Sequence, residues 1–251
     1  MHSVDELIAL VVREQDDDAR WTAIQELHAL NTREVFERAV QLCRSAEVAE
    51  RIAGADVIGQ LESFSEDGVR TLVGMIDDPD AKVVESVIHA LGQQRDPRTV
   101  DALVRAAQHD AANVRWAAAN ALEDHIADDR AERVLLALMR DGDSAVRDRA
   151  TFAVGSLSDR DTPRIRAALA ERLQDGDAAV ANEAALGLAR RRDARAIPYI
   201  AVAIESPESE IEEAAEEITS PDMLTELLKA RDALGDAMGL QQLIQRCRAR
   251  L

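Results

Sequence analysis

The chain has 251 residues, of which 47% are hydrophobic and only 2% are aromatic. This hydrophobic content supports a folded core and excludes global disorder. A predominance of Ala, Leu, Val and Ile favours contacts between helices over a β-sandwich or an aromatic-lined cofactor pocket. The 30 basic and 48 acidic side chains leave a formal charge of −18. Because this charge repels a phosphate backbone, nucleic acid is disfavoured as a partner.

No membrane span or cleavable leader is apparent in the sequence. The first 15 residues carry acids ahead of their apolar part, and no stretch approaches the ~18 apolar residues that a membrane helix needs. Cys43 and Cys247 have no metal-type partner nearby in the sequence. They are expected to be small buried hydrophobes in a reducing compartment. We therefore expect a cytoplasmic protein without membrane contacts.

The first predicted helix covers residues 4–14, and one apolar pattern then recurs along the chain. The pattern is clearest from Val114, taken as position zero, with Arg115 at +1 and small or apolar residues at +4, +5, +7 and +8. The seven copies have their zero positions at residues 19, 50, 83, 114, 146, 180 and 211. These positions are separated by 31, 33, 31, 32, 34 and 31 residues. Spacings of three and four within a copy place its apolar residues on one helix face.

A turn precedes most of these signature helices, and a second helix follows most of them. The turns include residues 77–82, 141–145 and 175–179, each with Asp residues suited to cap the coming helix. The second helices include residues 97–108, 130–140 and 163–174. A hairpin of about 32 residues cannot bury enough apolar surface alone, so the hairpins must stack. The sequence predicts a single all-α domain over residues 1–251, closed by a C-terminal cap at 221–251.

The order of a turn Asp, Val-Arg, Ala-Ala, Ala-Leu and Gly resembles the HEAT repeat, particularly the bacterial HEAT-like repeats of phycobilisome lyases. The resemblance spans roughly residues 16–220. It implies a right-handed α–α superhelix, a solenoid of seven to eight hairpins, with the signature helices on the concave side. It also implies a hydrogen-bond ladder between the turn acids and the basic residues at +1. The acids would be Asp80, Asp143 and Asp177, and the basic residues Arg20, Arg51, Arg115 and Arg147.

Positions +2 and +6 of the signature helix lie one turn apart and away from its apolar stripe, so they could face a partner. The candidate partner-binding residues are Trp21, Gln25, Asp56, Glu85, His89, Trp116, Asn120, Asp148, Asn182, Glu213 and Glu217. Their acidic character indicates a basic protein segment as the partner, bound more weakly at high salt. The alternative is a solvated face that aids solubility. Trp116 likewise either anchors a partner or covers an alanine-rich helix surface.

Enzymatic readings find less support in the sequence. His125 lies near Asp124, Asp128 and Asp129, but these acids suit a turn after a helix better than a metal site. The His-Glu pairs of HEAT-like di-iron hydroxylases are absent, and the sequence predicts no cofactor, metal or catalytic site. We expect a non-enzymatic scaffold for a protein partner. The alternative is a HEAT-like enzyme or enzyme subunit, either bilin lyase-like or alkylpurine DNA glycosylase-like. The partner and the oligomeric state stay open.

Overall fold

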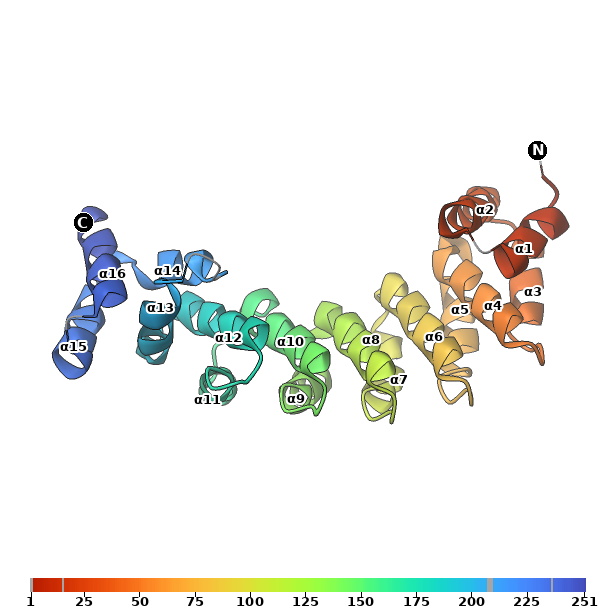
Figure 1. Cartoon of the computed structure of the whole chain (residues 1–251). Coiled ribbons are helices and arrows are strands. Elements are labelled where there is room, and N and C mark those ends of the chain that lie inside the picture. Colours follow the sequence, from red (N-terminus) through yellow and green to blue (C-terminus); the bar gives the residue numbers. More distant parts are fainter. Residues whose placement is uncertain (1, 15, 207–209, 236) are drawn as a thin grey trace. The chain divides into compact units, whose positions relative to one another are not determined.

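A computed structural model describes residues 2–14, 16–206, 210–235 and 237–251, and every regular element in these ranges is helical. The chain divides into two compact units, residues 1–125 and 126–251, which are described separately below. Helical hairpins are stacked within each unit (Figure 1). This confirms the predicted all-α repeat fold, whereas the single domain over residues 1–251 stays a prediction.

Unit 1 is built from eight α-helices and three short 3₁₀ turns among its described residues. Helices α4, α6 and α8 carry the signature pattern and pack side by side, while α3, α5 and α7 each pack against the signature helix that follows. The helices are α1 (Val4–Arg13), α2 (Asp17–Leu30), α3 (Arg33–Leu42), α4 (Val48–Gln60), α5 (Ser65–Val73), α6 (Ala81–Gln94), α7 (Val100–Ala106) and α8 (Ala112–Leu122). The 3₁₀ turns are Glu62–Phe64, Pro97–Thr99 and Glu123–His125.

Unit 2 repeats this arrangement, with α10, α12 and α14 as its signature helices. The helices are α9 (Asp129–Leu138), α10 (Ser144–Phe152), α11 (Pro163–Arg172), α12 (Ala178–Arg190), α13 (Ile197–Ala203), α14 (Glu212–Ile218), α15 (Leu224–Leu234) and α16 (Met238–Ala249). A π-helical turn, Ala153–Leu157, continues α10. The predicted cap at 221–251 forms the α15–α16 hairpin, and α16 packs on α13.

The signature helices stack closely because small residues occupy their contact faces. The valines at position zero, Val83, Val114, Val146 and Val180, are fully buried. The alanines and glycines at +4, +5, +7 and +9 let the backbones approach. The approach is closest where a Cβ added to Gly187 would lie 2.7 Å from the Cα of Gly155. A larger residue at such a position would force the two helices apart.

The turn aspartates cap the signature helices, as predicted. The side chain of Asp80 accepts a hydrogen bond from the Lys82 backbone N–H at 2.9 Å. Asp143 caps α10 and Asp177 caps α12 in the same way. Each cap satisfies a backbone donor that the first helical turn leaves without a partner.

The predicted ladder between repeats exists, but the acids assigned to it were wrong. Arg51 donates to Asp78 at 2.8 and 3.0 Å, and Arg147 donates to Asp175 at 2.9 and 2.8 Å. These acids stand two residues before the capping residues Asp80 and Asp177. The reason is that Asp80, Asp143 and Asp177 already point at their own helix N-termini. The earlier aspartate accepts the N–H of the capping residue and still offers its oxygens to the preceding repeat.

Of the other two predicted ladder arginines, Arg20 departs from this pattern. Arg20 pairs with Asp56 and also donates to the backbone oxygen of Val11 at 3.0 Å. Arg115 donates to the backbone oxygens of His109 and Asp110.

Candidate functional site: an acidic pocket in unit 2

The predicted +2 and +6 residues do not form one continuous site within either unit. His89 and Asn120 line a unit-1 cavity of about 270 Å³. Trp21 lines another unit-1 cavity, of about 520 Å³. Asp148, Asn182 and Glu213 line a unit-2 cavity of about 330 Å³. The structure thus gathers six of the eleven predicted residues into three cavities.

The unit-2 cavity lies along three successive signature helices and is called the acidic pocket below. Asp148 comes from α10, and Asn182 and Glu183 come from consecutive positions of α12. Glu213 comes from the first turn of α14, and Glu210 precedes that helix. The remaining lining is apolar and consists of Ala179, Leu186 and Ala214. Four carboxylates therefore surround a cavity with an apolar wall.

Two of these carboxyl groups are partly removed from water. Burial raises the pKa of Asp148, and the negative charge of Asp177 raises it further. No donor reaches the Asp148 carboxylate within the part of the chain that the structure describes. Burial also raises the pKa of Glu183, although a hydrogen bond from the Ser156 hydroxyl at 3.2 Å opposes the shift. The charge of Arg190 also opposes the shift of Glu183, whereas no cation lowers the pKa of Asp148. The ionised Asp148 therefore lacks the compensation that a nearby cation would supply.

The other polar groups of the acidic pocket are held in place by neighbours. The Tyr199 hydroxyl donates to the Asn182 side-chain oxygen at 2.8 Å and fixes the orientation of that amide. Glu213 pairs with Arg190 at 2.6 Å. Arg149 also interacts electrostatically with Glu183. The four acids outnumber these two arginines, so the electrostatic character of the pocket is negative.

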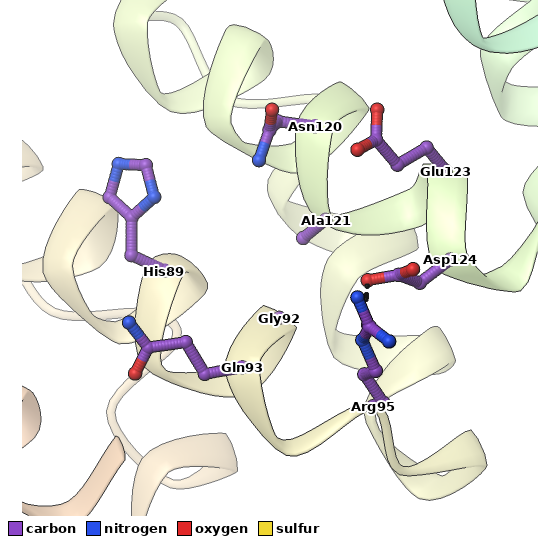
Figure 2. A pocket seen from close by; sticks show the side chains of 8 residues that line it. All are labelled: His89, Gly92, Gln93, Arg95, Asn120, Ala121, Glu123 and Asp124. Carbon is purple, nitrogen blue, oxygen red and sulfur yellow. Dashed lines mark ion pairs between the residues drawn. The ribbon is translucent and has the colours of Figure 1, made fainter. Parts of the chain in front are cut away.

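The smaller unit-1 cavity is polar and is lined by one arginine and two acids (Figure 2). His89 on α6 lies across from Asn120 on α8, and Arg95 pairs with Asp124 at 3.3 Å. A Cβ at Gly92 would lie 3.2 Å from the Ala121 Cβ, so the glycine allows the close approach of the two helices. Among the described residues, no group of three or more His, Cys, Asp or Glu side chains could hold a metal ion.

Several predicted residues lie outside these cavities. Asp56 pairs with Arg20 and accepts a hydrogen bond from Ser86, so its carboxylate serves packing between repeats. Glu85 accepts from the Asn113 amide at 2.6 Å. Gln25 and Glu217 are exposed.

The two tryptophans differ in exposure although both occupy position +2. Trp21 is 48% exposed, whereas Trp116 is partly buried. Partner binding by Trp116 therefore stays a prediction, and the structure offers Trp21 as the more accessible indole.

The pattern at +2 and +6 missed residues that the cavities contain. Gln60 and Gln93 stand at +10, one turn beyond +6, and line the cavity of Trp21. Extending the same face by four residues would have found them. Glu183 stands at +3, on the flank of this face, and nothing in the repeat template marks it.

The remaining sequence expectations concern cysteines and membranes. Both cysteines are buried, as expected. Burial raises the pKa of Cys43 to about 12 and also raises that of Cys247, which disfavours the nucleophilic thiolate in both. None of the described helices combines the length and apolar character needed to cross a bilayer.

Comparison with known proteins agrees with this architecture. The family described as HEAT repeats matches residues 69–155 and 131–219. The protein YibA of Escherichia coli K12 is 28% identical over 210 residues, which cover 78% of this chain and 72% of YibA. The X-ray structure of YibA has a TM-score of 0.77 at 24% identity and covers 98% of this chain and 93% of that one. A crystal structure of a Kap121p mutant has a TM-score of 0.67 at 14% identity. It covers 93% of this chain but 29% of Kap121p. Both structural matches establish similarity of fold alone.

Proposed function

Since the chain belongs to the HEAT repeat family, we propose that it is a non-enzymatic scaffold whose acidic pocket binds a basic segment of a partner protein. The observation that carries this proposal is the Asp148 carboxylate, which faces a cavity, is partly desolvated and has no donor. A cation from a partner would supply the missing compensation. Fold alone does not define function, so the proposal rests on this pocket.

The shape of the acidic pocket suits a long cationic side chain. Ala179, Leu186 and Ala214 would contact the methylene stem, while Asp148 and Glu183 would face the charged end. Hydrogen bonds between ionised partners are stronger than neutral ones, and partial desolvation increases the attraction. The amide of Asn182, held by Tyr199, would limit the orientations that the bound side chain can adopt.

No specific observation favours the enzymatic alternative. Asn120 supplies an amide where a glycosylase-like site needs a carboxylate, and Asp124, which lines the same cavity, is paired with Arg95. We therefore develop only the binding function.

The test is a titration of the full chain with a fluorescent octapeptide of alternating lysine, arginine and glycine. The double variant Asp148→Asn, Glu183→Gln should weaken binding about tenfold, since a charge-assisted hydrogen bond contributes roughly 1.5–3 kcal/mol. Lowering the pH should also weaken binding. Protonation removes the attracting charges, and the raised pKa values place this loss above the usual range of carboxyl groups.

A matched control separates the pocket from the net charge of the molecule. Glu34→Gln with Asp77→Asn also removes two negative charges, from exposed positions in unit 1. This control should change the affinity by less than about twofold, because isolated surface charges interact weakly. An equal loss in both double variants would show that the peptide responds only to net charge and would reject the proposal.

A further inference from the structure

The larger unit-1 cavity has a chemistry of its own and is called the Trp21 cavity below. Its volume is about 520 Å³. Trp21 and His28 come from α2, Gln60 ends α4, Glu62 lies in the following 3₁₀ turn, and Gln94 ends α6. With Gln93 and Ser65, an exposed indole, an imidazole, three amides, one hydroxyl and one carboxylate therefore line a single cavity.

Hydrogen bonds within the fold define which polar atoms remain for a ligand. The His28 Nδ1 lies 2.6 Å from the backbone oxygen of Gln60. Because a carbonyl oxygen can only accept, Nδ1 must carry the proton, and in the neutral ring Nε2 is left as an acceptor. The Gln94 Nε2 donates to the backbone oxygen of Gly59 at 2.9 Å, which leaves the Gln94 Oε1 as a second acceptor.

The carboxylate of Glu62 adds further acceptor capacity. Glu62 is exposed, and no donor within the described part of the chain is bonded to its carboxylate. The other two amides are joined, because Gln60 donates through Nε2 to the Gln93 Oε1 at 2.6 Å. The Trp21 cavity thus offers a ligand the acceptors of His28, Gln94 and Glu62 together with a negative charge.

We propose that the Trp21 cavity binds the guanidinium group of an arginine side chain. Guanidinium has five N–H donors and no acceptor, which complements the free acceptors of His28, Gln94 and Glu62. Its planar, weakly hydrated cation also stacks on an indole face, as the 48% exposed ring of Trp21 allows. The inference rests on the proposed function in one respect, that the partner carries a basic segment.

The same features disfavour other occupants. A lysine ammonium is compact and strongly hydrated, so it gains less from a flat ring and from acceptors spread around a cavity. A proline-rich segment would use the indole, but its proline rings carry no positive charge for Glu62 to attract. A neutral isostere of arginine keeps the shape and loses the charge that Glu62 and the indole recognise.

The experiment follows the indole N–H signal of Trp21 in the ¹⁵N-labelled full chain, identified by its persistence in Trp116→Phe. The ligands are N-acetyl-arginine amide and its lysine and citrulline counterparts. The arginine amide should shift the Trp21 signal saturably, the lysine amide should bind more weakly, and citrulline should give no saturable shift. Equal shifts from arginine and citrulline, or no saturable shift with arginine, would overturn the proposal.

Variants give a second readout on the side-chain amides of Gln60 and Gln94. Trp21→Leu should weaken arginine binding between roughly two- and fivefold, the factor that an exposed cation–π contact contributes. Glu62→Gln should reduce the preference for arginine over citrulline. Unchanged binding in both variants would place the ligand elsewhere and overturn the proposal.

The two proposed sites can fail separately. Asp148→Asn with Glu183→Gln, in unit 2, should leave the Trp21 titration unchanged. Normal arginine binding together with an octapeptide affinity that this variant does not alter would reject the acidic pocket and retain the Trp21 cavity. The reverse pattern would reject the Trp21 cavity alone.

Discussion

Arg191 shows how a single residue can be mistaken for surface charge. In sequence, Arg190, Arg191 and Arg192 form a triplet at a helix end, where cations complement the helix dipole. In the structure Arg190 pairs with Glu213 and Arg192 with Asp222, whereas Arg191 is buried. The Arg191 guanidinium donates to backbone oxygens that include those of Gly155 and Gly187, at 2.7 and 2.8 Å. It therefore supplies donors to buried carbonyl groups of the π-helical turn and of α12.

Arg191→Met should lower the free energy of unfolding by about 3 kcal/mol, because it leaves several buried carbonyl oxygens without donors. Urea denaturation of the full chain would measure the change. Arg192→Met is the matched control, and it removes only an exposed ion pair worth less than about 1 kcal/mol. Similar losses in the two variants would contradict a special role for Arg191.

The repeat template predicts the direction of a side chain, but not its exposure, which depends on neighbouring repeats. The template placed both tryptophans off the apolar stripe, yet Trp21 is exposed whereas Trp116 is partly buried. Because both tryptophans occupy position +2, their side chains leave the helix in the same direction. The atoms that cover each ring come from neighbouring repeats, whose residues differ. The exposed fraction therefore could not be read from one copy of the pattern.

At the scale of elements, the periodic pattern predicted the paired helices and their caps, but not which acid forms the ladder. Two aspartates separated by one residue stand before α6, α10 and α12. Both are plausible in sequence because both are short, acidic and next to a helix start. The structure separates their roles: the second caps its own helix, and the first binds the arginine of the preceding repeat, as Asp78 and Asp175 show. Only the direction of each carboxylate in space distinguishes them.

A double-mutant cycle tests this division. Arg51→Ala with Asp78→Ala should show a coupling energy of about 1–2 kcal/mol, since these partly buried side chains form two hydrogen bonds. Arg51→Ala with Asp80→Ala should be nearly additive, and Asp80→Ala alone should cost ~1 kcal/mol as a lost cap. Unfolding free energies from urea titrations supply all the terms. Strong coupling to Asp80 would restore the original assignment.

At the scale of the molecule, the charge of −18 acts on stability and on binding in opposite directions. Repulsion among like charges opposes the folded state, and salt screens it. Attraction between the acidic pocket and a cationic segment is screened by the same ions. The repeat architecture could be predicted because the pattern recurs seven times. The cavities could not, because they form where side chains of neighbouring helices leave space.

Raising the salt concentration from about 0.02 to 0.5 M should therefore increase the thermal midpoint of unfolding while weakening octapeptide binding at least tenfold. Thermal scans by circular dichroism and the fluorescence titration measure the two effects on one preparation. The ladder pairs Arg51–Asp78 and Arg147–Asp175 are mostly shielded from solvent, so salt should weaken their attraction only slightly. Affinity that does not change with salt would favour a solvated acidic face without a binding role.

The contact between Gly155 and Gly187 has a consequence for how such a chain can diversify. A side chain at either position would meet the backbone of the opposite helix, so this close approach requires glycine on both sides. The repeats that contain these two glycines are therefore complementary to one another and cannot be exchanged freely with other repeats of the chain. Recombination that inserted or deleted a repeat between them would separate the two glycines. We therefore expect additional repeats to be tolerated better at other junctions of the array.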